Sequence, residues 1–409
     1  MIEAQKNIGL SYAELYAQLH QKLNGTEVTE RYDVIVVGVG SMGAATCYHL
    51  AKRGFSVLGL EQFDIPHEQG SHAGQSRLIR KAYGEDIAYV PLLERAYENW
   101  KTLEVETGSK VYFETGLTYF GNPKNTFLDT VRESARQYEI PLQSHGAADH
   151  PLFQLSEDQQ ILHEPEAGLL TPERSIMLMA LEALRLGATL QTGEAVKKWQ
   201  HEPGGVTVST AKQTYRARKL IFTSGAWTGK LLPQLAPRLK VTRQVLGWFQ
   251  PQNWESFALG EFPCWFMEAE GHDFYGFPVL PTASFGGPVG LKVALHYPGL
   301  TVTDPSEISG PILDSEKQEL TEFLQHFLPS GYIKALTYKT CLYTNSPDTH
   351  FILDHLSGFD KDVVIAAGFS GHGFKFVSVI GEILADLAVM GQTPLPIEFL
   401  RLNRFEGQN

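Results

Sequence analysis

Three glycines near the start of the chain have the spacing of a pyrophosphate-binding turn. Gly38, Gly40 and Gly43 form G-x-G-x-x-G. In this pattern the first glycine permits a tight turn, the second lets the backbone approach the pyrophosphate, and the third lets a helix pack closely on a strand. Glu61 follows at the distance where a carboxylate can accept hydrogen bonds from ribose hydroxyl groups. The pattern predicts a dinucleotide site, but by itself it does not separate FAD from NAD.

Two arginines lie in the long loop after Glu61, which is rich in glycine, serine and histidine. Arg77 and Arg80 are three residues apart and would share one face if the segment were helical. Their planar, bidentate groups suit the recognition of an anion. A solvated surface turn is the alternative interpretation.

A second glycine-rich turn covers residues 368–375 and repeats the order strand, turn, helix near the C-terminus. Lys375 falls at the start of the predicted helix, where the helix dipole disfavours a cation. We therefore expect an anionic partner and a functional role for Lys375. A surface lysine paired with a carboxylate is the alternative.

Further candidates lie in the predicted strands of the second half. Lys292 and His296 fall on one strand face because strand side chains alternate. Both are costly on a half-buried face unless they are used, although the face could simply be exposed. Aromatic residues around Tyr275 could bind an alkylamine by cation–π contact or could form ordinary core. Taken alone, Cys341 predicts a small buried hydrophobe.

The elements that must position these residues follow from the apolar pattern. Residues 34–37 are apolar and β-branched and predict a buried strand, residues 44–53 predict a helix, and residues 55–60 predict a second strand that ends at Glu61. A pyrophosphate would lie at the N-terminus of this helix. Before this unit, Ser11 is expected to cap a helix that ends at Leu23 and packs on the domain surface; a partner helix is the alternative.

Bulk properties exclude several classes of protein. The chain has 409 residues, enough for two domains, and its net charge of −12 argues against nucleic-acid binding. The 3 cysteines, Cys47, Cys264 and Cys341, are far apart, which argues against disulfides and zinc and favours a cytoplasmic location. No apolar run suits a membrane span, and the N-terminus does not have the pattern of a secretory signal.

Seven stretches, in order, resemble the monomeric sarcosine oxidase and N-methyltryptophan oxidase family of flavin-dependent amine oxidases. They are YDVIVVGVGSMG, GSHAGQSRLIRKAYGE, KLIFTSGAW, FYGFP, GLKVALH, TCLYT and AAGFSGHGFKF. The resemblance runs from Tyr32 to the C-terminus. It implies a mixed α/β fold in which a Rossmann-like FAD-binding domain is interleaved with a substrate domain on a large mixed β-sheet. The predicted boundaries are a helical N-terminal extension (1–30), the FAD-binding domain (31–110, 170–240 and 335–409) and the substrate domain (111–169 and 241–334).

The resemblance also implies an activity. Members oxidise the C–N bond of a secondary amino acid to an imine, FAD takes the hydride equivalent, and O₂ reoxidises it with formation of hydrogen peroxide. The implied partners are a small amino acid and O₂, without nucleic acid or membrane, and the implied state is a monomer. The alternatives are an FAD-dependent amino acid dehydrogenase with another electron acceptor and a non-catalytic nucleotide-binding protein.

Individual roles carry over from the matching motifs. Cys341 matches the cysteine bonded to the flavin 8α carbon, which implies covalent FAD, although Ala73 replaces one of two adjacent histidines of the flavin loop. Lys292 matches the lysine that promotes reaction with O₂. Arg80 and Lys375 match the pair that holds the substrate carboxylate.

The remaining matches concern the flavin and the amine. Arg77 matches an arginine packed against the flavin face. Tyr275, His296 and Tyr343 match residues that orient the amine, and Met267 falls near a pocket methionine, with one residue less before Tyr275. The other expected cofactor contacts are Gly38, Gly40, Ser41, Met42, Gly43, Glu61, Ser71, His72, Gly371, Gly373 and Lys375.

Overall fold

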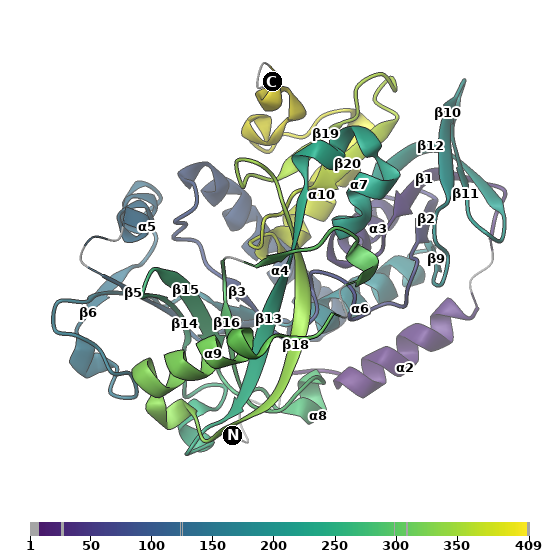
Figure 1. Ribbon diagram of the computed structural model, residues 1–409. Coiled ribbons are helices and arrows are strands. Elements are labelled where there is room, and N and C mark those ends of the chain that lie inside the picture. The colour runs from purple at the N-terminus through teal and green to yellow at the C-terminus, as the bar shows by residue number, and fades with distance from the viewer. Residues whose placement is uncertain are drawn as a thin grey trace.

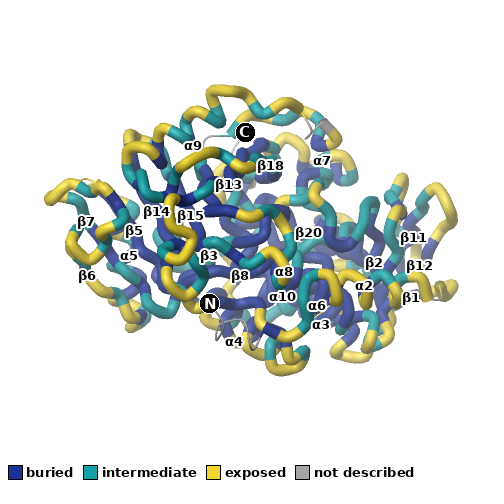
Figure 2. The backbone as a smooth tube through the Cα atoms, turned by 90° about the horizontal axis from the view of Figure 1, so that it is seen from below, coloured by how far each residue is buried: buried dark blue, intermediate teal, exposed yellow. Residues whose placement is uncertain are grey.

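The computed structural model describes residues 8–25, 28–122, 124, 126–297, 299–307 and 310–406, so residues 1–7 and 26–27 of the predicted N-terminal extension lie outside it. Two large sheets and one small sheet carry the fold, with helices packed around them (Figure 1). Buried segments are concentrated in the sheets and in the helices α3 (Ser41–Lys52), α6 (Pro172–Arg185) and α10 (Val377–Met390) (Figure 2). The mixed α/β fold predicted from the sequence is confirmed.

The first sheet has eight strands and is built around β1. Its strands are β1 (Arg31–Val37), β2 (Val57–Leu60), β9 (Thr189–Gln191), β10 (Lys198–Glu202), β11 (Gly205–Ser209), β12 (Thr214–Phe222), β19 (Ile352–His355) and β20 (Val363–Ala367). β1 runs parallel to β2 and β12 on its two sides. A strand flanked by parallel neighbours reads as a continuous apolar run, which is why this one could be predicted from its sequence.

The second sheet has nine strands. They are β5 (Leu117–Gly121), β6 (Gln143–His145), β7 (Gln160–Glu164), β13 (Lys240–Gln250), β14 (Cys264–Ala269), β15 (His272–Phe277), β16 (Leu291–Leu295), β17 (Leu300–Thr301) and β18 (Lys334–Asn345). β13 and β18 form a long antiparallel ribbon, visible at the centre of Figure 1. β18 thus pairs within this sheet, whereas the predicted boundaries assign residues 335–345 to the FAD-binding domain.

A third, small sheet corrects one expectation about the arginine loop. It consists of β3 (Arg77–Ile79), β8 (Gly168–Leu170) and β4 (Tyr112–Glu114) in the order β3-β8-β4. Arg77 therefore lies on a strand, so the condition under which Arg77 and Arg80 would share a helical face is not met. The reason is tertiary: β3 pairs antiparallel with β8, so the segment takes its conformation from a partner far along the chain.

The helices are α2 (Tyr12–Leu23), α3 (Ser41–Lys52), α4 (Val90–Thr107), α5 (Thr126–Gln137), α6 (Pro172–Arg185), α7 (Thr228–Leu231), α8 (Thr282–Phe285), α9 (Asp314–Phe327) and α10 (Val377–Met390). α3 packs against α6 and α10, and α10 also packs against α4. The predicted cap of α2 is confirmed, because the Ser11 hydroxyl accepts from the Glu14 amide and the Glu14 carboxylate accepts from the Ser11 amide.

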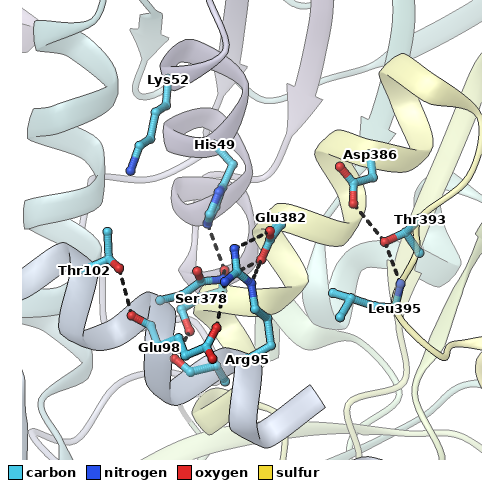
Figure 3. A network of polar contacts seen from close by, with 12 residues as sticks. His49, Lys52, Arg95, Glu98, Thr102, Ser378, Glu382, Asp386, Thr393 and Leu395 are labelled. Carbon is cyan, nitrogen blue, oxygen red and sulfur yellow. Dashed lines mark hydrogen bonds and ion pairs between the residues drawn. The ribbon is translucent and has the colours of Figure 1, made fainter. Parts of the chain in front are cut away.

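A polar network fixes α3, α4 and α10 to one another (Figure 3). The Arg95 guanidinium of α4 donates two hydrogen bonds of 2.8 Å to the Glu382 carboxylate of α10. The His49 Nε2 of α3 lies 2.9 Å from the Ser378 carbonyl oxygen of α10. These contacts hold the helix that follows the glycine turn of β1 against the helix that follows the C-terminal glycine-rich turn.

Within the described part of the chain, no helix combines the length and apolar character needed to cross a membrane. The same residues contain no group of three or more His, Cys, Asp or Glu side chains arranged to hold a metal ion.

Candidate active site

A large cavity opens at the C-terminal end of β1. Its volume is about 350 Å³. It is lined by the glycine turn after β1, by the end of β2, by the loop of residues 70–77, by β18 and by the glycine-rich turn after β20. The predicted cofactor residues on its walls are Gly38, Gly40, Ser41, Met42, Glu61, Ser71, His72, Arg77, Gly371 and Gly373.

Each of the three glycines of the first motif is required at its position for a different physical reason. Gly38 has φ +91°, a left-handed conformation that favours glycine. A Cβ on Gly43 would stand 1.9 Å from the Gly38 carbonyl oxygen, so Gly43 allows α3 to pack on β1 rather than lining the cavity. Gly40 is the N-cap of α3, and a Cβ there would meet only His72, at 3.7 Å. The backbone at the helix N-terminus is therefore open to an anion.

Glu61 is held in place by backbone donors. Its Oε2 accepts from the Val39 amide at 2.8 Å, and its Oε1 accepts from the Phe63 amide at 3.0 Å. Burial raises the pKa of Glu61 to about 6, against the opposing effect of these hydrogen bonds. Each carboxylate oxygen has capacity for a further hydrogen bond, as recognition of ribose hydroxyl groups requires.

The cavity fits a dinucleotide on further grounds. Its shape joins two glycine-rich turns that each precede a helix, and the Nε2 of His72 on its wall is buried without a hydrogen-bond partner among the described residues. Burial lowers the pKa of His72 to about 4, so the ring is neutral near pH 7 and offers one donor and one acceptor. The glycine turns would hold the pyrophosphate and Glu61 would hold the ribose of FAD.

A second, smaller cavity of about 50 Å³ lies beside the first. It is lined by Arg77, Leu78, Arg80, Glu85, Phe266, Tyr275, His296, Tyr343, Gly371, His372, Phe374 and Lys375. Four of these residues, Arg77, Tyr343, Gly371 and Phe374, also line the large cavity. The structure therefore brings the predicted substrate residues Arg80, Lys375, Tyr275, His296 and Tyr343 together next to the predicted cofactor site.

Arg80 forms a buried ion pair that the sequence did not predict. Its Nη2 lies 2.6 Å from both carboxylate oxygens of Glu85. Burial alone would raise the pKa of Glu85, but Arg80 and, less strongly, His372 and Lys375 lower it to about 2. Nε and Nη1 of Arg80 have no hydrogen-bond partner within the described residues. Donors therefore remain for another carboxylate.

Lys375 is the second buried cation of the small cavity. Its Nζ donates to the His372 carbonyl oxygen at 2.8 Å. Burial lowers the pKa of Lys375 to about 7, with Glu85 raising it and Arg80 lowering it. Glu85 is thus the nearby anion that a lysine at the start of a helix was expected to need.

Tyr83 lies against both cations, His372 is hydrogen-bonded to Tyr83, and both residues were missed in the sequence. The Tyr83 ring centroid lies 5.0 Å from the Arg80 guanidinium carbon and 5.2 Å from Lys375 Nζ. His372 Nε2 lies 3.1 Å from the Thr349 carbonyl oxygen, so Nε2 carries the proton and Nδ1 accepts from the Tyr83 hydroxyl at 2.6 Å. Tyr83, Glu85 and His372 all lie inside motifs that carried the family resemblance, which was the available signal.

Three further lining residues of the small cavity, Tyr275, His296 and Tyr343, are aromatic and uncharged near pH 7. His296 Nδ1 lies 3.3 Å from the Tyr343 hydroxyl, and burial lowers the pKa of His296 to about 3. Burial also raises the pKa of Tyr275 to about 12. The lining of the small cavity therefore combines two cations, Arg80 and Lys375, and the Glu85 carboxylate with neutral polar groups, which suits a ligand that carries both a carboxylate and an amine.

Met267 was placed wrongly by the sequence. Strand side chains alternate, and in β14 it is Phe266 that lines the small cavity with Tyr275. Met267 is fully buried in a separate core cluster with Trp265 and Phe274. The shorter spacing from Met267 to Tyr275 was the signal of this shift.

Lys292 lies in β16, which ends at Leu295, and His296 follows directly, with its amide donating to the Asp273 carbonyl oxygen at 2.7 Å. Lys292 Nζ lies over the Phe277 ring, the His296 ring lies against the Tyr275 ring, and these two aromatic rings contact each other, which is consistent with the predicted shared face. The Nζ of Lys292 donates to the carbonyl oxygens of Gly74 and Ser76 at 2.6 and 2.8 Å. The Ser76 hydroxyl oxygen, at 3.3 Å, is a third acceptor. Burial and the neighbouring Arg77 lower the pKa of Lys292, while three acceptors match the three donors of an ammonium group.

Cys341 is buried in β18, and the residues after it, Leu342 to Thr344, line the large cavity. Burial raises the pKa of its thiol, and the nearby Arg77 and Lys292 oppose this effect. Cys341 thus directly precedes the cavity-lining residues of β18, and its buried thiol is protonated near pH 7.

Comparisons with known proteins agree with this geometry. The sequence pattern of the family described as FAD dependent oxidoreductase (DAO) matches residues 33–387. A monomeric sarcosine oxidase of Streptomyces avermitilis is 40% identical over 373 residues, which cover 90% of this chain and 96% of the relative. An N-methyl-L-tryptophan oxidase of Citrobacter koseri is 35% identical over 382 residues, covering 92% and 99%.

Solved structures share the fold. NikD, an unusual amino acid oxidase essential for nikkomycin biosynthesis, superposes with a TM-score of 0.80 at 26% identity, covering 91% of this chain and 98% of that chain. An L-proline dehydrogenase from P. horikoshii has the same TM-score of 0.80 at 23% identity, with 93% and 99% covered. The profile match, these relatives and a dinucleotide cavity built on G-x-G-x-x-G lead to one conclusion: the chain belongs to the family of FAD dependent oxidoreductases.

Proposed function

We propose that the protein is an FAD-dependent oxidase of N-methyl or other secondary amino acids, which converts the C–N bond to an imine and passes the electrons to O₂ to give hydrogen peroxide. The observation that carries this proposal is the small cavity, whose lining combines Arg80 and Lys375 with uncharged aromatic side chains and shares four residues with the lining of the dinucleotide cavity. FAD, when bound, supplies the acceptor for the hydride equivalent.

Different side chains of the small cavity are proposed to bind the carboxylate and the amine of the substrate. Arg80 and Lys375 would hold the substrate carboxylate, for which Arg80 has unused donors. The amine would lie toward Tyr275, His296 and Tyr343. His296 stays neutral at physiological pH because of its low pKa, so this wall does not repel an amine. The amine must be neutral to release hydride, so the rate of flavin reduction should rise with pH through the pKa of the amine.

Lys292 is proposed to promote the reaction with O₂. Its ammonium is fixed by backbone carbonyls and shielded from solvent, with Phe277 and Trp248 rings 4.6 and 5.7 Å from Nζ. A preorganised cation in a site without water stabilises negative charge that develops on oxygen far better than one in water. Lys292 thus favours an oxidase over a dehydrogenase with another acceptor.

We further propose that FAD is bonded to the Sγ of Cys341. The position of Cys341 directly before the cavity-lining residues of β18, with Arg77 near enough to affect its thiol, supports this attachment. A monomeric state and a cytoplasmic location complete the proposal; all three cysteines are unpaired, as in a reducing compartment.

The first experiment is the visible spectrum of the purified protein before and after acid precipitation. Yellow colour that stays in the pellet supports the bond to Cys341, and Cys341→Ser should move it to the supernatant. The same sample is then mixed anaerobically with sarcosine, N-methyltryptophan and pipecolate. Bleaching by one of them, followed by hydrogen peroxide on aeration, supports the oxidase. A flavin that none of them bleaches would leave a nucleotide-binding protein without turnover.

The electron acceptor is tested with Lys292→Met. Removing one preorganised charge costs about 10²- to 10³-fold in rate at such sites. We expect this loss in the reaction of reduced enzyme with O₂, with anaerobic reduction changed far less. Lys334→Met, the same change at an exposed position of β18, is the control. Equal rates with O₂ in all three proteins would contradict the role of Lys292 and favour the dehydrogenase.

A further inference from the structure

The position of the Lys292 ammonium is set by the backbone of a single short loop. Two of its three acceptors are the carbonyl oxygens of Gly74 and Ser76, and the third is the Ser76 hydroxyl. We call residues 74–76 the cradle. Any movement of the cradle must move the charge of Lys292, which is 1% exposed and has its donors directed to it.

The backbone of the cradle has an unfavourable conformation that hydrogen bonds from other segments stabilise. Gln75 has φ +73°, a left-handed value that costs a non-glycine residue about 1–3 kcal/mol. Glu173, in the first turn of α6, offsets this cost: its Oε1 accepts from the amides of Gly74 and Gln75 at 2.8 and 3.0 Å. The cradle is thus anchored on one side to the N-terminal end of α6.

The Gln75 side chain anchors the cradle on the other side. Its Nε2 donates to the Gly286 carbonyl oxygen at 2.6 Å, and its Oε1 accepts from the Trp248 indole at 3.3 Å. Gly286 belongs to the turn that includes α8, residues 281–287. The position of this turn therefore determines where the Gln75 side chain is held.

The 281–287 turn is in turn held by the N-terminal segment, residues 8–23. A Cβ on Gly286 would stand 2.7 Å from the Tyr12 ring, so this ring lies directly on the backbone of the turn. α2, which starts at Tyr12, packs on both α6 and α8. Leu15 and Leu19 of α2 are fully buried, so the helix is firmly seated.

Arg174, next to Glu173 on α6, connects the N-terminal segment with the 281–287 turn. It is fully buried, and burial lowers its pKa to about 10. Its Nη1 donates to the carbonyl oxygens of Leu10 and Ser284 at 2.6 and 3.0 Å. Its Nη2 donates to those of Ile8 and Lys110 at 3.0 and 3.3 Å. One guanidinium thus ties the N-terminal segment directly to the 281–287 turn.

We propose that the N-terminal segment, residues 8–23, is a positioning element for Lys292: through Tyr12 and Arg174 it fixes the 281–287 turn, which fixes Gln75 and the cradle. The segment precedes residue 33, where the match to the family model begins, so it lies outside the part of the chain that this model describes. The inference rests on the proposed function because it assigns the segment to the oxygen-reacting side of the site.

The test uses Tyr12→Ala in the full-length holoenzyme. Tyr12→Phe keeps the ring on Gly286 and should behave as wild type. Tyr16→Phe is the control for the loss of a hydroxyl group from α2, since Tyr16 lies one turn later and its hydroxyl donates to Asp64. Hydrogen exchange of the amides of residues 74–76 is measured first, because it does not depend on activity. The rates of anaerobic reduction and of reaction with O₂ follow by stopped flow.

We expect Tyr12→Ala to speed amide exchange in the cradle and to slow the reaction with O₂, each by roughly three- to thirtyfold, the range for mutations that act through a coupled network. The rate of anaerobic reduction should stay within about twofold of the wild-type rate, because the proposed carboxylate-binding residues, Arg80 and Lys375, do not belong to this network of contacts. Two results would overturn the inference. The first is an unchanged rate of amide exchange in Tyr12→Ala. The second is faster exchange in Tyr12→Ala with an unchanged rate of reaction with O₂, when Lys292→Met does react slowly with O₂. If Lys292→Met itself reacts normally with O₂, the oxygen role of Lys292 fails, and with it this function of the segment, whatever the exchange shows.

Discussion

The Arg80 guanidinium is bound by the Glu85 carboxylate, with Nη2 2.6 Å from both carboxylate oxygens, at the wall of the small cavity. A carboxylate of the protein itself therefore already binds Nη2 of Arg80, the side chain that is proposed to bind the substrate carboxylate. The pair keeps Arg80 neutralised while buried, since an unpaired buried charge would destabilise the fold by about 3–5 kcal/mol. Glu85 thus competes with the ligand and also makes its binding site stable.

This relationship predicts two opposite effects of Glu85→Gln. Removing the competing charge should tighten the binding of acetate, a carboxylate without an amine, by roughly tenfold, the value of one charge-assisted hydrogen bond. The unpaired Arg80 should lower the melting temperature, and acetate should restore it because a ligand stabilises the folded state. Differential scanning fluorimetry with acetate titrations measures both. Equal affinity of the variant and the wild type would show that Glu85 does not compete.

Lys375 should make carboxylate binding depend on pH. Its pKa of about 7 lies below the ordinary lysine value, so the charge is present below pH 7 and is lost as the pH rises through 7. The Kd of acetate should therefore rise above pH 7, with a limit of about tenfold per pH unit. Lys375→Arg stays charged and should bind acetate with little change between pH 6 and 9. A flat profile in the wild type would exclude Lys375 as the titrating group.

Phe266 and Met267 are neighbours with opposite predicted effects. Phe266→Ala should widen the small cavity and raise kcat/KM for larger N-substituted amino acids relative to sarcosine, because Phe266 forms its wall. Met267→Ala should lower the free energy of unfolding by about 2–5 kcal/mol through a core cavity and leave the substrate preference unchanged. Urea denaturation and substrate profiles separate the two. A shift of preference in the Met267 variant would place that residue at the cavity after all.

Gly43→Ala should prevent close packing of α3 on the turn after β1. The added Cβ would meet the Gly38 carbonyl oxygen at 1.9 Å, and backbone cannot move aside cheaply. We expect a loss of stability of about 3 kcal/mol or more and a loss of bound flavin, read from the ratio of absorbance at 450 and 280 nm. Gly146→Ala is the control, since its Cβ would meet only Asp149, at 3.9 Å. Normal flavin content in Gly43→Ala would contradict the packing role.

The sequence predicted best those features that depend on local chain geometry. The turn of Gly38, Gly40 and Gly43 and the strands on both sides were predicted correctly because the motif and its context lie within about one supersecondary unit. The same holds for the cap of α2 by Ser11. Arg80 and Lys375 could be assigned from family motifs, and the structure brings them to one cavity.

Contacts between distant segments could not be predicted from the sequence. Lys292 finds its acceptors in a loop more than 200 residues earlier, and Arg77 lies on a strand only because β8 pairs with it. Met267 was exchanged with Phe266 because a shift of one residue along a strand reverses the face. The pairing of Glu85 with Arg80 needed the fold of the intervening turn, although both residues stood in the same matched stretch.

Tyr343 lines both cavities, and its ring lies so close to Gly371 that a Cβ there would stand 2.4 Å from it. The two cavities therefore share this side chain, and under the proposed function a substitution of Tyr343 would alter both the substrate site and the cofactor site. Phe266 and Leu78 line the small cavity alone. Substitutions at Phe266 and Leu78 can therefore change the preference for the amine without altering the lining of the large cavity. Substitutions at Tyr343 alter both cavities at once, so natural or laboratory evolution of new substrate preferences is expected to proceed through the first two positions.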